Sequence, residues 1–284
     1  MYHYFHLTMN SLKLGHFYAS ILFSLNIFNF CNAVAVEQDL SLTKMERIAL
    51  EKFKHEVSSL VSEDYMKEDI YLIRWLRAKN LNHEQATAML LENLKWRKLN
   101  NMSTIHQEDW SDFRDDYEYF IDTHDKSGRP IATLRFGDWD IRNAILTGKG
   151  QRLTRYLYKA LDEVTAKIRA LQREGKQITQ WVSLLDMEGY AISTHGCLGC
   201  LGVYLSYVTA YENYFPGSVH DIILVNTPSI FEVVLRITRP LLGEATRNML
   251  HVFGTNKNQW QSYLLKNIDA NQLDYHFGGT KIRS

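Results

Sequence analysis

The stretch Tyr214–Gly243, YFPGSVHDIILVNTPSIFEVVLRITRPLLG, constrains the fold of this chain more than any other. It contains three of the four prolines, Pro216, Pro228 and Pro240, and each stands where the chain is expected to change direction. Between the first two prolines, residues 221–226 form a short continuous apolar run with β-branched side chains. Such a run is typical of a strand that is covered on both faces, as in an α/β core.

A short apolar helix is expected to follow this strand. The sequence Thr227-Pro228-Ser229 can start a helix, because proline is tolerated in the first turn. Only Glu232 and Arg236 interrupt the apolar residues that follow, and their i,i+4 spacing predicts that they pair. A helix with so little polar surface lies in a core or covers a cavity that holds an apolar molecule. From this segment alone, an ordinary core helix is favoured.

Three further motifs accompany this segment, in order, over roughly residues 45–280: LIRWLRAK at 72–79, DKSGRP at 125–130 and LDYHFGG at 273–279. None is specific by itself, but their order and separations resemble the CRAL-TRIO lipid-binding family. The resemblance implies an α/β fold in which a mixed β-sheet forms the floor of a ligand pocket. Helices flank the sheet, a mobile gate helix matching Ser229–Arg239 closes the pocket, and a small all-α N-terminal subdomain precedes it.

The first 35 residues lie outside that resemblance. Residues 17–30 are a 14-residue apolar run, and Ala33-Val34-Ala35 has the small-x-small pattern of a cleavage site, which together predict a signal peptide cut before Val36. A membrane anchor, for which the run is short, and a misassigned start or disordered cytosolic extension are the alternatives. We expect the secretory pathway or the extracellular space if the leader is cleaved, and the cytoplasm otherwise. A cleaved leader would make Asn101, in the sequon Asn-Met-Ser, a glycosylation site.

We therefore divide the chain into a signal peptide at 1–35, a helical subdomain at 36–104 and the lipid-binding domain at 105–284. In the subdomain we expect helices at 42–60 and 69–78, and a third helix capped by Asn82. The first should bury a stripe formed by Met45, Ile48, Ala49, Phe53 and Val57. We expect no downstream β-rich Golgi-dynamics module of the kind that some relatives carry.

The resemblance also implies a set of ligand contacts. The expected lining residues are Phe136, Ser183, Leu185, Tyr204, Tyr207, Tyr211, Phe231, Val234, Leu235, Thr238, Met249 and Phe253. Arg74 matches a family arginine that reaches toward the ligand headgroup, and Gly217 and Ser218 belong to the same headgroup region. By spacing alone, the three tyrosines are more typical of a core than of a ligand wall.

The identity of the ligand follows from what is missing at three positions. Relatives that transfer phosphatidylinositol carry Glu-Arg after the Tyr-Pro pair and a lysine in the helix after the gate. Here the matching residues are Gly217, Ser218 and Met249, none of them charged. We therefore expect no selectivity for phosphatidylinositol, and instead a sterol, tocopherol, retinoid or fatty acid.

Signatures of other functions are absent from the sequence. It has no G-x-S-x-G, Walker A, H-E-x-x-H or G-x-G-x-x-G motif. Cys197 and Cys200 have redox spacing, but the neighbouring glycines favour close helix packing, and no further ligands stand at a zinc-binding spacing. Whether the two cysteines pair stays open. A formal net charge of zero gives no electrostatic reason to expect nucleic acid.

Together these observations predict a monomeric, non-enzymatic carrier of a hydrophobic molecule, without cofactor or metal. It would exchange its ligand during transient contact with a membrane surface. The leading alternative is a lipid-fold interaction module that acts through a protein partner, and a lipid hydrolase is a distant third.

Overall fold

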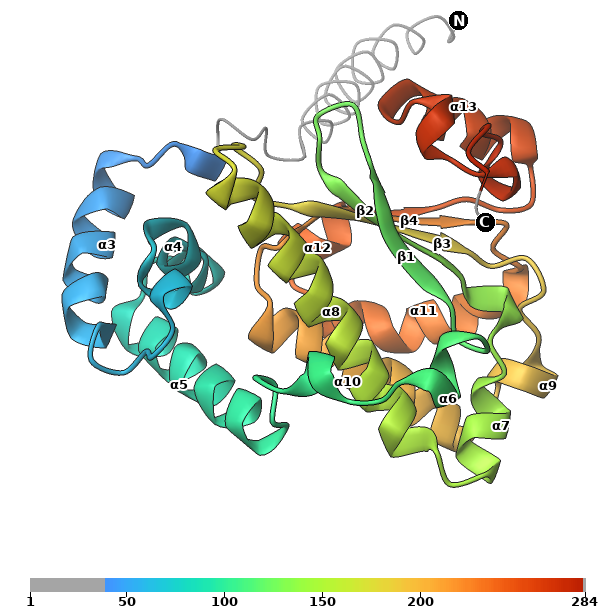
Figure 1. Cartoon of the computed structure of the whole chain (residues 1–284), viewed down its shortest axis with the longest axis horizontal. Coiled ribbons are helices and arrows are strands. Elements are labelled where there is room, and N and C mark those ends of the chain that lie inside the picture. The colour runs from blue at the N-terminus through green and yellow to red at the C-terminus, as the bar shows by residue number, and fades with distance from the viewer. Residues whose placement is uncertain (1–38, 283–284) are drawn as a thin grey trace, which may run out of the picture. The chain divides into compact units, whose positions relative to one another are not determined.

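The computed structural model describes residues 39–282 (Figure 1). The signal peptide predicted at 1–35 lies outside the described residues. Within them, the fold combines a helical N-terminal region with a five-stranded sheet flanked by helices, so the predicted α/β class is confirmed.

The N-terminal region contains α3 (Lys44–Val57), the 3-10 turn η1 (Asp64–Lys67), α4 (Asp69–Ala78) and α5 (His83–Leu99). A capping box between Thr43 and Glu46 starts α3, and the Asn82 side chain accepts a hydrogen bond from the Gln85 N–H at the start of α5. The helix predicted over 69–78 has these bounds.

The stripe predicted for α3 was wrong in part. Met45 and Ile48 are 72% and 63% exposed, whereas Leu50, Phe53 and Val57 are buried against α4 and α5. A single narrow face of α3 meets its neighbours, and the spacing i, i+3, i+7 from Leu50 follows that face. The predicted stripe included apolar residues from the adjacent face.

The sheet is mixed, as predicted. Its strands are β1 (Tyr119–His124), β2 (Pro130–Arg135), β3 (Trp181–Asp186), β4 (Val219–Val225) and β5 (Leu250–Val252), side by side in that order. β1 and β2 are antiparallel and all other neighbours are parallel. The β1–β2 turn is tight because the Asp125 carboxylate accepts the N–H groups of Ser127 and Arg129, and Gly128 has a φ of 83°.

The remaining helices and turns connect the strands. They are η2 (Ile105–Gln107), α6 (Ser111–Arg114), η3 (Phe136–Asp138), α7 (Ile141–Leu146), α8 (Gly150–Arg173), α9 (Ile192–His195), α10 (Leu198–Tyr214), η4 (Ser229–Phe231), α11 (Glu232–Thr238), η5 (Arg239–Leu241), α12 (Glu244–Asn248), α13 (Lys257–Asn267), η6 (Ala270–Gln272) and η7 (Tyr275–Phe277).

Different helices lie on the two faces of the sheet (Figure 1), and each face has its own core. On one face, Val182, Leu184 and Ile223 pack with Trp260 and Leu264 of α13. The other face turns toward α8, α10 and α11. Because successive residues of a strand point to opposite faces, each central strand contributes to both cores. This explains why β3 and β4 are apolar without alternation.

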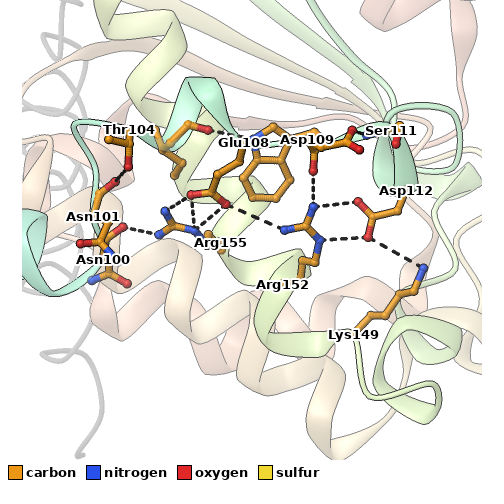
Figure 2. Close-up of polar contacts among 12 residues, drawn as sticks. Asn100, Asn101, Thr104, Glu108, Asp109, Ser111, Asp112, Lys149, Arg152 and Arg155 are labelled. Atoms are coloured by element: carbon orange, nitrogen blue, oxygen red, sulfur yellow. Dashed lines mark hydrogen bonds and ion pairs between the residues drawn. The ribbon is translucent and has the colours of Figure 1, made fainter.

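A charged clamp joins the segment after α5 to the long helix α8 (Figure 2). Arg152 makes two hydrogen bonds of 2.9 Å to the Asp112 carboxylate, and its guanidinium lies 4.4 Å from the centre of the Trp110 ring. Arg155 binds Glu108 and the carbonyl of Asn100. The hydrogen bond from Arg152 lowers the pKa of Asp112 below its ordinary value, against the opposing effect of burial.

Candidate ligand-binding cavity

An apolar cavity of about 180 Å³ lies between the sheet and helices α8, α10 and α11. Trp181, Ser183 and Leu185 of β3 border it, whereas the alternate residues Val182 and Leu184 face α13. The wall opposite the sheet includes Leu153, Leu157, Ala160, Leu161 and Val164 of α8, five residues on one helical stripe. No lining residue carries a formal charge.

The three tyrosines of α10 also border the cavity. The Tyr204 hydroxyl donates a hydrogen bond of 3.1 Å to the carbonyl of His195, and the Tyr211 hydroxyl interacts with Thr246. Burial raises the pKa of Tyr207 to about 12. The Tyr207 and Ser183 hydroxyls have no hydrogen-bond partner among residues 39–282, so both can accept a polar group of a ligand.

The gate helix, which we define as η4, α11 and η5 (Ser229–Leu241), covers one side of the cavity. Phe231, Val234, Leu235 and Thr238 border the cavity, on the face for which these residues were predicted. The opposite face exposes a row of large apolar side chains with exposed fractions of 39% to 46%: Ile230, Val233, Ile237 and Leu241. The gate helix is thus apolar both toward the cavity and toward solvent.

The predicted ion pair on the gate helix was wrong. Glu232 binds Arg239 at 3.1 Å, and not Arg236. At 100° per residue, a side chain seven positions on returns to within about 20° of the starting direction, closer than one four positions on. The sequence rule for i,i+4 pairs does not include this longer spacing.

Ten of the twelve predicted lining residues border the cavity, and Met249 and Phe253 do not. Leu250 of β5 faces the cavity, so Phe253, three residues later, points to the other face, where its ring lies 5.0 Å from Tyr263. Met249 precedes β5 and packs against the adjacent core. The alternation of side-chain directions along a strand, applied to the last strand, would have selected Leu250.

The predicted headgroup residues lie apart from the apolar lining. Arg74 and Ser218 border a smaller hollow of about 60 Å³ between α4, α5, α8 and the turn after α10. A Cβ atom at Gly217, whose φ is 64°, would lie 3.9 Å from Cγ of Arg74. The Arg74 guanidinium donates to the carbonyl of Thr179, its Nε has no partner in the described part of the chain, and burial lowers its pKa.

Residues 39–282 were also searched for membrane-spanning helices and for metal sites. No helix there is both long and apolar enough to cross a membrane. No three His, Cys, Asp or Glu side chains in the same range are placed to hold a metal ion.

Comparison with known proteins identifies the class. Residues 114–279 match the CRAL/TRIO domain, and the chain belongs to this family. Its members generally bind and transfer lipids or other small hydrophobic molecules and are generally not enzymes. The structure resembles the crystal structure of Sfh5 with a TM-score of 0.64, over 78% of this chain and 84% of that one, at 13% sequence identity. At such low identity, the similarity supports the fold alone.

Proposed function

We propose that this protein binds and transfers a neutral or weakly polar lipid, and that it does not select phosphatidylinositol. The observation that carries the proposal is the lining of the cavity, which combines an uncharged apolar wall with the two unpaired hydroxyls of Tyr207 and Ser183. Each methylene group that enters such a cavity contributes about 0.8 kcal/mol of binding free energy. A long chain or fused ring system therefore binds tightly with one contact to a hydroxyl or a protonated carboxyl group.

A phosphorylated headgroup would find little compensation in this cavity. A buried charge needs an opposite charge or several hydrogen bonds, and no lining residue supplies a charge. Gly217, Ser218 and Met249 offer none at the positions where phosphatidylinositol carriers have them. Arg74 lies in the smaller hollow, where Thr179 occupies part of its donor capacity.

Ligand exchange requires movement of the gate helix. The cavity volume of about 180 Å³ is below the roughly 300–1,000 Å³ of typical ligand sites, so a lipid would displace part of the wall. The gate helix is short and exposes Ile230, Val233, Ile237 and Leu241 on its outer face. A membrane surface would cover this apolar row, and the exposed Arg236 beside it would attract anionic headgroups. We infer that exchange takes place during such transient contact.

Competitive loading from mixed liposomes tests the proposed ligand class. The purified chain is incubated with vesicles that contain phosphatidylcholine, phosphatidylinositol, cholesterol and oleic acid, then separated and extracted. The expected extract is enriched in sterol or fatty acid over phosphatidylinositol, relative to the vesicles. Preferential uptake of phosphatidylinositol would contradict the proposal. Introducing the family charges is a poor test, because Ser218 is 1% exposed and Gly217 has a left-handed φ.

A pair of tyrosine variants tests how the polar group is bound. Tyr207→Phe removes the unpaired hydroxyl, and Tyr204→Phe removes one that already binds His195. We expect Tyr207→Phe to lower the preference for cholesterol over its hydrocarbon analogue cholestane by about fivefold, since one hydrogen bond contributes about 1 kcal/mol. Tyr204→Phe should leave this preference unchanged. If Tyr207→Phe and Tyr204→Phe show the same preference for cholesterol over cholestane, Tyr207 is not the polar contact.

A further inference from the structure

Cys197 and Cys200 form a disulfide at the start of α10. Cys197 is the N-cap residue of this helix, and its Sγ accepts a hydrogen bond of 3.0 Å from the N–H of Cys200. Cys200 is completely buried, Cys197 is half-buried, and Leu198 between them is 88% exposed. Cys197 is therefore the more accessible of the two cysteines.

The glycine spacing that favoured close packing has its own explanation. A Cβ atom at Gly199 would lie 2.7 Å from Cγ2 of Ile145, so α7 packs directly on the turn between the two cysteines. The small residue and the disulfide are thus two separate features of the same turn. Close packing against α7 accounts for Gly199, and Cys200 belongs to the adjacent core, but neither contact requires the two sulfurs to be bonded.

We propose that Cys197 and Cys200 are a reversible dithiol–disulfide couple that exchanges with a small-molecule thiol such as glutathione. The thiolate of the small thiol attacks Sγ of Cys197, which breaks the bond to Cys200 and leaves Cys200 as a thiolate that takes up a proton. A second small thiol then attacks the mixed disulfide, releasing Cys197 and a small-molecule disulfide. The two small thiols supply two electrons and two protons, and the reverse sequence forms the bond again.

The position on the helix suits this chemistry. In the reduced protein, a thiolate on Cys197 would face the unpaired N–H groups at the N-terminus of α10, an environment that stabilises negative charge. The exposed Leu198 shows that the turn is open to solvent, whereas the buried Cys200 is the resolving partner. Two cysteines with this unequal accessibility can open and close without unfolding of the rest of the chain.

The couple is connected to the cavity wall through His195. The Tyr204 hydroxyl donates to the carbonyl of His195, whose Nε2 lies 3.0 Å from the carbonyl oxygen of Phe136. Tyr204 and Phe136 both border the cavity. Tyr190 stacks on His195 at 4.4 Å and contacts the ring of Phe231 in the gate helix at 5.0 Å. Reduction would release the turn that follows His195, and a bound lipid would leave faster. This second step rests on the proposed function.

Thiol trapping tests the couple by itself. The full chain, which has three cysteines, is equilibrated in its folded state with reduced and oxidised glutathione and quenched with acid, and it is then unfolded and labelled with a maleimide of known mass, so that the buried Cys200 also reacts when it is reduced. We expect the number of labels to change by two in one step, following the square of the reduced concentration over the oxidised one. The variant Cys197→Ser/Cys200→Ser should show no change. A constant label number in the wild type, whether the bond never forms or never opens without denaturant, would overturn the proposal.

Release of dehydroergosterol, a fluorescent sterol, to phosphatidylcholine vesicles tests the connection to the cavity. We expect release from the reduced wild type to be about threefold faster or more than from the oxidised protein. The double serine variant should release at one rate in both buffers. An equal rate in the two wild-type states would overturn the connection to the cavity. Failure of the wild type to load any lipid would count against the proposed function, and the label count would still decide the redox couple.

Discussion

Phe231→Asp is expected to abolish most ligand loading, because it places a carboxylate against the cavity. Phe231 is 8% exposed, borders the cavity and contacts the ring of Tyr190. Loss of the buried phenyl group removes about 1.5–3 kcal/mol of apolar burial free energy from the closed, loaded state. A desolvated carboxylate raises the free energy of the same state by several kcal/mol, unless the gate helix turns outward. A total of at least about 3 kcal/mol corresponds to a loading constant lowered more than about 100-fold.

Two variants on the same helix provide the control. Val233→Asp introduces the same carboxylate on the outer face, where Val233 is 46% exposed, and Glu232→Ala removes an exposed ion pair with Arg239. An exposed ion pair contributes about 0–1 kcal/mol, and the sterol is added without vesicles, so membrane contact of the outer face is not required for loading. Both variants should therefore load nearly as well as the wild type. Loading is measured with a fluorescent sterol in detergent-free buffer, after circular dichroism has verified the fold. Equal loading by Phe231→Asp and Val233→Asp would refute the assignment of the inner face.

The remaining predictions concern the clamp, the outer face of the gate helix and the compartment. Arg152→Ala should lower the free energy of unfolding in urea by about 1–2 kcal/mol, whereas Lys149→Ala, whose Nζ is 4.0 Å from Asp112, should change it little. Because the pKa of Asp112 is lowered in the folded state, this stabilisation is present above the unfolded pKa of about 4 and is lost as pH falls below it, so the difference should shrink toward pH 3; a difference independent of pH would argue against the pair. Ile237→Glu should reduce sedimentation with phosphatidylcholine vesicles severalfold without altering the urea midpoint, and unchanged sedimentation would exclude the outer face from membrane contact. Expression in animal cells should yield a chain that begins at Val36 with a glycan on the exposed Asn101, and an intact, unglycosylated cytosolic chain would refute both parts.

The sequence predicted the central part of the fold because its strong patterns are local. The continuous apolar run in β4 and the proline-bounded gate helix identify a covered strand and its neighbour, and the inner face Phe231, Val234, Leu235 and Thr238 follows from helical spacing. The pairing of Glu232 with Arg239 depends on how the chain continues after α11, which an i,i+4 rule does not describe.

Features that depend on which face meets a neighbour were less predictable. Met45 and Ile48 of α3 are as apolar as the residues that pack, and only the position of α4 distinguishes them. Phe253 was predicted to line the cavity, whereas the alternation of side-chain directions along the last strand places it against Tyr263. The separation of Arg74 from the apolar cavity follows from the arrangement of α4 beside α8, which no local pattern specifies.

The lipid that accompanies the folded protein is the most direct test of the account. The chain is expressed in animal cells, purified without detergent, and its bound lipid is extracted and identified by mass spectrometry, with Phe231→Asp purified in parallel. We predict close to one neutral or weakly polar lipid per chain, such as a sterol, tocopherol, retinoid or fatty acid, and a strongly reduced amount in the variant. Phosphatidylinositol as the main bound species, or equal lipid in both proteins, would contradict the assignment of this cavity.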